Sequence, residues 1–205
     1  VNALMMVDDT LYVGGNFATA GGVAGTQHIA AWSTTTNTWH ALGAGVNNAV
    51  YSLSARDDTI YVGGSFTAAS GQPTTAGIAA WSEADDTWNA ISPSVTASSI
   101  QALAALNDDT LYVGGGFNVG GVTSMAQVAL RNAGAWSAPS PGVPNDRADA
   151  FALQGRSTAS TSDDTLFVGG VFTTTPAPYI AALRPGGASW DTLGTGVNSY
   201  VEALP

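Results

Sequence analysis

Short apolar runs, separated by polar and glycine-rich clusters, recur along the whole chain. The clearest is the segment Asp8–Phe17, with the sequence DDTLYVGGNF. It recurs as Asp57–Phe66, Asp108–Phe117 and Asp163–Phe172. The first aspartates of successive copies are 49, 51 and 55 residues apart. Self-similarity at a nearly fixed period of this length is the signature of a repeat architecture.

Each copy contains four short runs that favour β-strands, because they are rich in β-branched and aromatic residues and lack helical spacing. The first run of each copy is Val1–Val7, Val50–Ala55, Ile100–Leu106 and Ala150–Gln154. The second run follows Asp-Asp-Thr and ends in a glycine pair. The third is Ile29–Trp32, Ile78–Trp81, Val128–Leu130 and Ile180–Leu183. The fourth is Trp39–Leu42, Trp88–Ile91, Trp136–Ala138 and Trp190–Leu193.

Turn residues between these runs predict hairpins. Asp-Asp-Thr predicts a tight turn between the first two strands, since aspartate tolerates turn conformations. Thr34–Asn37 and its counterpart Glu83–Asp86 predict a second hairpin, between the third and fourth strands. Four antiparallel strands in each unit of about 50 residues are typical of a β-propeller blade. The predicted fold is therefore all-β, a propeller of consecutive four-stranded blades.

The predicted repeats span residues 1–49, 50–99, 100–149 and 150–200, and residues 201–205 begin a further one. Val201–Leu204 occupies the same position in the repeat as Val1–Leu4, and a closed ring of four blades would need only one of these two segments. We expect the array to continue into a larger propeller or a tandem of propellers. The alternative is that the terminal strand helps to close the ring. Residues 1–205 are thus a single propeller or part of a larger one.

The positions that recur in every copy are predicted to be structural. Glycine pairs allow neighbouring backbones to approach closely, and each tryptophan can cover a junction between blades. These positions are Asp8, Asp9, Gly14, Gly15, Trp39, Asp57, Asp58, Gly63, Gly64, Trp88, Asp108, Asp109, Gly114, Gly115, Trp136, Asp163, Asp164, Gly169, Gly170 and Trp190.

Composition narrows the class of partner. The chain has 205 residues, no cysteine, 5 basic residues against 15 acids, and a formal charge of -10. Nucleic acid and anionic membrane surfaces are disfavoured because both need clustered positive charge. No apolar run reaches the length of a membrane span, so no membrane insertion is expected in this segment. Charged residues make up 10% of the chain, against about a quarter in typical proteins. A composition low in charge and rich in threonine is typical of extracellular and cell-surface proteins, so we expect such a location.

Candidate chemistry is sparse. Calcium is one interpretation of the Asp-Asp pairs, but the loop lacks the spaced aspartates and downstream glutamate of a calcium motif, so we favour hairpin turns. His28 and His40 have no copies in other repeats, and we expect ordinary surface or half-buried residues. Glu83 and Glu202, the only glutamates, show no partner. No nucleophile motif is present. We therefore expect no catalytic, metal-binding or cofactor-binding residues, although paired carboxylates for glycoside hydrolysis stay open.

The segment Arg147–Asp149 and Arg156 depart from the repeat pattern. We expect a solvated loop with an ion pair there, and a contact patch is the alternative.

The chain resembles the kelch repeat, which pairs an apolar strand ending in Gly-Gly with a downstream aromatic residue and a tryptophan. Here these are Tyr61–Gly64, Trp81 and Trp88, whereas the third and fourth copies have Leu130 and Leu183 in place of Trp81. The fuller pattern is similar to repeats of large surface and secreted proteins, including the fungal cortical polarity-marker family. That resemblance implies a non-catalytic propeller or interaction module and supplies no ligand. Kelch-type copper oxidases require a cysteine, so their chemistry is excluded.

Three function hypotheses follow. The first is a structural or adhesive module of an extracellular assembly, binding other protein domains or copies of itself, in a filament for example. The second is a propeller that binds carbohydrate or peptide, and converging exposed aromatics would favour it. The third is a glycoside hydrolase or lyase, and paired acids in a cleft of only one repeat would favour it. The deciding observation is the assembly state, because a monomer that binds a soluble sugar contradicts the first hypothesis.

Overall fold

The structure is a computed structural model of all 205 residues. It describes residues 1–91, 95–106, 110–119, 128–132, 134–137, 147–154, 165–171, 178–183, 190–201 and 204, without the side chains of 95–98, 118–119, 128, 130 and 147–154. The chain divides into two compact units. The first is Val1–Ile100 with Phe117–Gly121, and the second is Gln101–Gly116 with Val122–Pro205.

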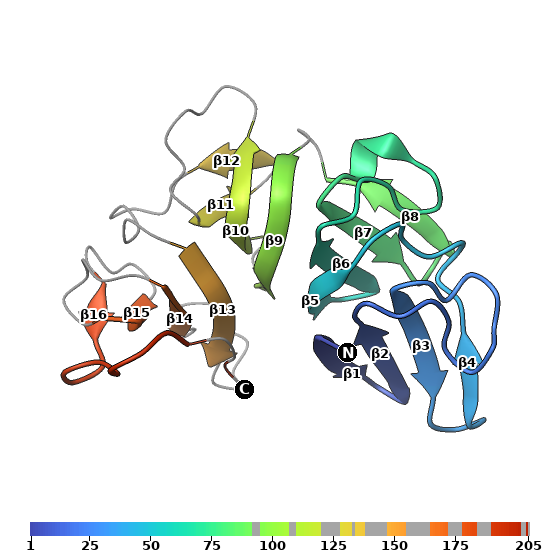
Figure 1. The fold of residues 1–205 in the computed structure, drawn as a ribbon, viewed down its shortest axis with the longest axis horizontal. Helices are drawn as coiled ribbons and strands as arrows, with labels where there is room; N and C mark the ends of the chain where they lie inside the picture. The colour runs from blue at the N-terminus through green and yellow to red at the C-terminus, as the bar shows by residue number, and fades with distance from the viewer. Residues whose placement is uncertain are drawn as a thin grey trace. The chain divides into compact units, whose positions relative to one another are not determined.

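The first unit contains two antiparallel four-stranded sheets, each with its strands in sequence order (Figure 1). Sheet 1 consists of β1 (Ala3–Val7), β2 (Thr10–Gly14), β3 (Ile29–Ser33) and β4 (Thr38–His40). Sheet 2 consists of β5 (Val50–Arg56), β6 (Thr59–Gly64), β7 (Ile78–Ser82) and β8 (Thr87–Ala90). A single 3-10 turn, Pro73–Thr75, lies in the loop between β6 and β7.

The third and fourth sheets have the same strand order. Sheet 3 consists of β9 (Val95–Ala105), β10 (Leu111–Val119), β11 (Val128–Asn132) and β12 (Ala135–Ser137). The first unit includes β9 up to Ile100 and β10 from Phe117, and the rest of this sheet belongs to the second unit. Sheet 4 consists of β13 (Arg147–Gln154), β14 (Thr165–Val171), β15 (Ile180–Leu183) and β16 (Asp191–Thr192). The prediction of an all-β chain with four antiparallel strands in each repeat is confirmed. No helix among the described residues is long and apolar enough to cross a membrane.

Aspartate and asparagine form the tight hairpins of the first unit. The β1–β2 and β5–β6 hairpins have two-residue loops, in which Asp8 has φ 45° and Asp57 has φ 49°. The β3–β4 and β7–β8 hairpins end on Asn37, with φ 55°, and Asp86, with φ 52°. Short polar side chains tolerate this left-handed region better than most residues. Both predicted hairpins are therefore present in the first two copies. The predicted turns at Asp108, Asp109, Asp163 and Asp164 lie outside the described residues.

Another left-handed position recurs just before the third strand of a sheet. It is occupied by His28 in sheet 1 (φ 61°), Gly77 in sheet 2 (φ 74°) and Tyr179 in sheet 4 (φ 67°). In each case its carbonyl accepts a backbone hydrogen bond from the second glycine of the pair. The N···O distances are 2.9, 3.0 and 3.1 Å from Gly15, Gly64 and Gly170. The same backbone path is thus kept with three different side chains.

The core of the first unit lies between sheets 1 and 2. Val50, Ile60 and Val62 are fully buried there, together with Phe66 and Leu42. The middle strands β2 and β6 are apolar on both faces, as expected for strands covered on both sides. A second cluster, in the second unit, joins Ala104 of sheet 3 to residues of sheet 4 that include Val168 and Trp190.

The loops after β2 and β6 share a buried threonine. Thr26 Oγ1 accepts a hydrogen bond from the Ala20 amide at 2.8 Å and donates to the Val23 carbonyl at 2.6 Å. Thr75 Oγ1 accepts from the Ala69 amide at 2.7 Å and donates to the Gln72 carbonyl at 2.5 Å. Both threonines are completely buried. The two loops differ in sequence, yet they close on the same internal hydrogen bonds.

Two sequence expectations about strands need correction. Arg147–Asp149 was expected in a solvated loop, but it forms the start of β13, paired with β14 through a bulge between Ala148 and Ala150. The strand β9 also begins at Val95, before the expected Ile100. Arg156 lies outside the described residues.

Candidate functional site

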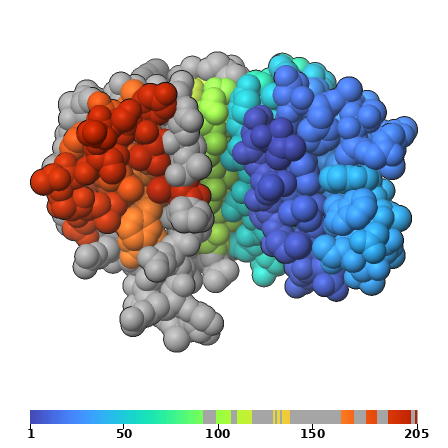
Figure 2. Space-filling model, turned by 60° about the horizontal axis from the view of Figure 1, so that its bottom comes forward, coloured from blue at the N-terminus to red at the C-terminus, as the bar shows by residue number. Residues whose placement is uncertain are grey.

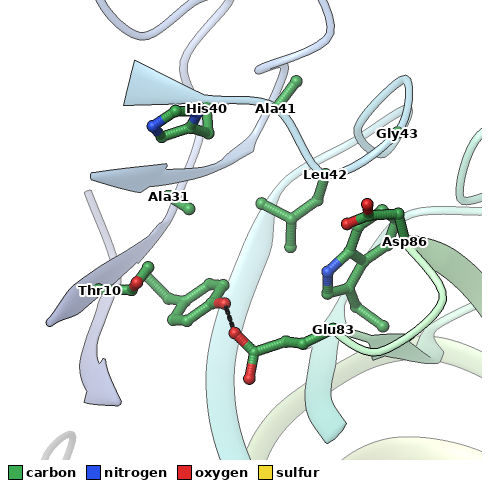
Figure 3. A pocket seen from close by; sticks show the side chains of 10 residues that line it. Thr10, Ala31, His40, Ala41, Leu42, Gly43, Glu83 and Asp86 are labelled. Carbon is green, nitrogen blue, oxygen red and sulfur yellow. Dashed lines mark hydrogen bonds between the residues drawn. The ribbon is translucent and has the colours of Figure 1, made fainter. Parts of the chain in front are cut away.

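A pocket of about 570 Å³ lies between sheets 1 and 2 of the first unit (Figure 3). It is lined by β2, by β3 and the chain around the end of β4, by β7, and by the β7–β8 hairpin. Its lining residues are Thr10, Tyr12, Ala31, His40, Ala41, Leu42, Gly43, Trp81, Glu83 and Asp86. No lysine or arginine is among them.

One side-chain hydrogen bond crosses this pocket. Tyr12 lies in the middle of β2, and its hydroxyl donates to Oε1 of Glu83 (Figure 3). Glu83 is the first residue of the β7–β8 hairpin, and its backbone N–H donates to the Asp58 carbonyl at 2.9 Å. The backbone of Glu83 is therefore fixed by its own sheet, and its side chain reaches across to the neighbouring sheet.

Burial and charge keep the Tyr12 hydroxyl protonated. Desolvation raises the pKa of Tyr12 well above its usual value, and the hydrogen bond to Glu83 raises it further. The negative charges of Glu83 and Asp86 act in the same direction. A protonated tyrosine donates to the carboxylate, so Glu83 serves as a hydrogen-bond acceptor at this site.

The pocket also has hydrogen-bond donors. Trp81 is 5% exposed, and its indole N–H makes no hydrogen bond to any part of the chain that the structure describes. The neighbouring Trp88, packed edge-on to Trp81 at 5.4 Å between ring centroids, instead donates to the Leu42 carbonyl at 2.9 Å. His40 is exposed, and its Nε2 lies 2.9 Å from Thr38 Oγ1. The pocket thus offers two carboxylates, an unpaired indole donor and an imidazole.

The predicted glycine pairs lie where neighbouring elements meet closely. A β-carbon on Gly14 would overlap Val50 Cγ1, and one on Gly64 would overlap the Ala49 carbonyl. On Gly15 it would lie 2.9 Å from the Val1 Cα atom. The corresponding neighbours of Gly63 and Gly169 are Ile100, at 2.7 Å, and Val201, at 2.5 Å. Gly114, Gly115 and Gly170 are buried in their strands.

The predicted tryptophans lie beside the third strand of their sheets. Trp39 packs edge-on to Trp32 at 5.1 Å, as Trp88 packs on Trp81. Trp190 is buried in the second unit, and Trp136 is half-buried. The aspartates Asp8, Asp9, Asp57 and Asp58 are all exposed on hairpins and do not line the pocket. In the described part of the chain no three acidic or histidine side chains are grouped to hold a metal ion.

The expectation that Glu83 has no partner is wrong. The signal was present, since Glu83 and Asp86 replace Thr34 and Asn37 of the first copy. The sequence could not predict that the β7–β8 hairpin of the second copy packs next to strand β2 of the first copy. His40 is exposed, as expected, but it lines the pocket. His28 is half-buried, and its buried Nδ1 has no partner in the described structure.

Comparison with known proteins gives a similarity in fold only. No family model matches the chain, and no curated protein matches it. Among solved structures, the chain is similar to the crystal structure of the computationally designed Ika8 protein, with a TM-score of 0.50 and 15% identity. The match covers 98% of this chain and 64% of the designed protein. At that identity the likeness concerns the course of the backbone alone.

Proposed function

We propose that this chain is a non-catalytic, kelch-like β-propeller module of an extracellular or cell-surface assembly. In this proposal its four-stranded sheets are propeller blades. Its partners are copies of itself or other protein domains, which pack against it sheet to sheet. The observation that carries the proposal is that the face buried between sheets 1 and 2 recurs, exposed, on other sheets.

The first half of this interface is on the first strand of a sheet. In β5, Val50 is completely buried against sheet 1, and Leu53 and Ala55 pack on the same core. The residues 49 positions earlier are Val1, Leu4 and Met6, which are 76%, 63% and 57% exposed. The N-terminal segment that carries them is dark blue on the surface in Figure 2. Sheet 1 therefore presents to solvent the apolar face that sheet 2 buries.

The second half of the interface follows the fourth strand. Leu42 and Val46 pack against residues of sheet 2, and they are 2% and 3% exposed. Their counterparts in the fourth copy are Leu193 and Val197, which are 38% and 42% exposed, and Tyr200 nearby is 56% exposed. Large apolar side chains exposed close together in sequence are consistent with a protein contact here. Two different complementary faces favour a heterologous, head-to-tail contact, which forms rings or filaments.

The close approach between sheets supports the propeller part of the proposal. A small glycine meets a β-branched residue of the following first strand or segment three times: Gly14 with Val50, Gly63 with Ile100 and Gly169 with Val201. A contact that repeats with the same residue types supports a common packing of each glycine against the strand or segment that follows its sheet. Such packing buries a continuous core between repeats.

The pocket supports a non-catalytic role. Glu83 and Asp86 are paired acids found in only one repeat, which is the pattern expected of a glycoside hydrolase. A glycosidase, however, needs one carboxyl that carries a proton to the leaving group. The neutral Tyr12 hydroxyl keeps its proton and donates a hydrogen bond to Oε1 of Glu83, so this carboxyl oxygen is engaged as an acceptor within the chain. Binding therefore fits this arrangement better than acid catalysis.

The test is the assembly state. We expect sedimentation velocity between about 1 and 200 μM to show concentration-dependent association. The double variant Leu4→Asp with Met6→Asp should weaken that association at least tenfold, because burying unpaired charges costs several kcal/mol, about 2 or more each. Thr35→Asp, on the exposed β3–β4 hairpin, is a control that adds one negative charge outside this face, and it should associate like the wild type. A wild-type chain that stays monomeric throughout, or a double variant that associates normally, contradicts the proposal.

A further inference from the structure

We propose that the pocket between sheets 1 and 2 is a binding site for a neutral carbohydrate, with room for one or two sugar rings. The inference rests on the donors, acceptors and apolar groups that line the pocket. It is independent of self-association through the sheet faces.

The lining matches a ligand that both donates and accepts hydrogen bonds. Glu83 and Asp86 are acceptors. The donor is the indole N–H of Trp81, which has no hydrogen-bond partner in the described structure; the Trp81 residue as a whole is 5% exposed. A sugar hydroxyl has one donor and two acceptor sites, so adjacent hydroxyls can pair with carboxylate and indole at the same time. Hydrogen bonds to a carboxylate are also stronger than those between neutral groups.

Other ligand classes fit the same groups less well. An anion would meet two carboxylates with no lysine or arginine lining the pocket to offset them. An ammonium ion or guanidinium group could donate to the acids, but it would leave the Trp81 N–H without an acceptor. A metal ion would need more ligands than the described residues bring together here.

The remaining lining suits the carbon skeleton of a sugar. Ala31, Ala41 and Leu42 form the apolar part of the pocket wall. Leu42 is fixed in position because it also belongs to the buried core. Small-molecule pockets typically enclose about 300–1,000 Å³ and combine an apolar lining with a few polar groups. The pocket, at about 570 Å³, lies within that range.

The acids of the pocket are not required by the repeat. Asn37 and Asp86 occupy the same left-handed position of their hairpins, with φ 55° and 52°. The turn therefore forms equally with an uncharged asparagine. Thr34 and Glu83 both donate their backbone N–H to the carbonyl of an Asp-Asp pair, at 2.9 Å in each hairpin. The turn itself therefore does not require the two carboxylates: Glu83 bonds Tyr12 of the neighbouring sheet, and both carboxylates line the pocket.

The experiment is a binding assay on the full chain. Lactose, maltose, cellobiose and diacetylchitobiose are each titrated to about 50 mM and followed by protein-detected NMR and calorimetry, since weak sugar binding is in the millimolar range. Spermidine, a lysine tripeptide and calcium chloride serve as probes for the competing ligand classes. We expect at least one sugar to bind, with shifts at Trp81 and its neighbours, and none of the cations to bind at the pocket.

Two variants and one matched control locate the site. Glu83→Gln keeps an amide oxygen for the Tyr12 hydroxyl but removes the charge, and Asp86→Asn restores the residue of the first copy. Each should weaken sugar binding about tenfold, and the double variant should abolish it, because charge-assisted hydrogen bonds are lost. Asp85→Asn changes the same hairpin outside the pocket, at a carboxylate that accepts from Ser82 Oγ at 3.1 Å. It should bind sugar like the wild type.

Three results overturn the inference: no sugar binding at the highest concentration, binding that survives the double variant, or a cation that binds at the pocket in place of sugar. Thermal melting of each variant confirms that it is folded before its binding is interpreted. Cleavage of a bound disaccharide would support the site but contradict the non-catalytic function proposed above, so the two proposals fail separately.

Discussion

The Tyr12–Glu83 hydrogen bond connects the first two repeats at the level of single side chains. Both residues are held by their own sheets: Tyr12 lies within β2, and the Glu83 backbone N–H donates a hydrogen bond to the Asp58 carbonyl. The raised pKa of Tyr12 means that folding favours the neutral hydroxyl over phenolate. A shift of this kind makes stability depend on pH.

We expect the free energy of unfolding to fall as pH rises above about 10, the usual pKa of tyrosine. In that range the unfolded chain loses the Tyr12 proton while the folded chain keeps it, so the unfolded state binds fewer protons and is favoured. The slope from this one residue is about 1.4 kcal/mol for each pH unit. Tyr12→Phe should remove this component and flatten the pH profile. Urea unfolding from pH 8 to 11 measures it, and equal slopes in both proteins would contradict the assignment.

Some single residues could be assigned from chemistry and others could not. The turn aspartates Asp8 and Asp57 followed from the tolerance of aspartate for left-handed backbone. Glu83 did not, because its partner is set by how two sheets pack and not by its neighbours in the chain. A difference between aligned copies marks such a position, but it does not say which side chain lies opposite.

At the scale of strands, the stacking of sheets depends on missing side chains. Gly14 lies against Val50 of the next sheet, and the Val50 N–H donates to the Gly15 carbonyl at 3.1 Å. Gly14 does not have a positive φ, so it is required by space and not by backbone conformation. This separates it from the turn glycines of the loops.

Gly14→Ala should therefore lower the free energy of unfolding by about 1–3 kcal/mol, as overpacking of a core does. The overlap is with one side chain, so truncation of that side chain should relieve it. We expect the double variant with Val50→Ala to be destabilised less than the sum of the two single variants, by about 0.5–3 kcal/mol. Chemical denaturation of the four proteins completes this cycle. If the losses in unfolding free energy of the two single variants simply add in the double variant, the side chain of Val50 is not what the new methyl group overlaps.

Strands were predictable where pattern and turn chemistry agreed. The Leu-Tyr-Val and Ile-Tyr-Val runs of β2 and β6 carry period, composition and flanking turns that all indicate a buried strand. Arg147–Asp149 was misassigned because its two charged residues outweighed the neighbouring apolar residues. In β13 the backbone pairing with β14 determines the conformation, and a bulge accommodates the irregular sequence.

At the scale of the molecule, electrostatics is dominated by an excess of acid. The formal charge is -10, and one ion pair of the described residues joins Arg56 to Asp57, at 3.9 Å. The Asp57 side chain in that pair is 89% exposed, so the pair contributes little. With 15 acids against 5 basic residues, we expect repulsion between like charges to outweigh attraction.

Salt should stabilise this protein. Raising sodium chloride from about 20 to 300 mM shortens the screening length to below about 10 Å and weakens the repulsion. We expect Tm to rise by about 2–4 °C, corresponding to about 1 kcal/mol for a chain of this size. Differential scanning calorimetry measures the shift, and tetramethylammonium chloride at matched concentration controls for specific sodium binding. A Tm that falls with both salts would indicate stabilising ion pairs.

The number of repeats and their strand order could be read from the chain because the pattern recurs four times. The packing partners of the outer faces could not, since Leu4 and Leu53 look alike in sequence, yet Leu4 is 63% exposed while Leu53 packs on the core. Burial at these positions depends on what lies on the other side of the strand.

The left-handed position shared by His28, Gly77 and Tyr179 has a consequence for how such proteins diverge. Its geometry is maintained by a backbone hydrogen bond to the glycine pair, whatever the side chain. A histidine or tyrosine there carries a conformational cost of about 1–3 kcal/mol, which neighbouring contacts must absorb. A sequence difference between copies at this position therefore does not mean a difference in backbone structure. A sequence profile that required glycine here would give the first and fourth copies low scores, although their backbones follow the same path as the second copy.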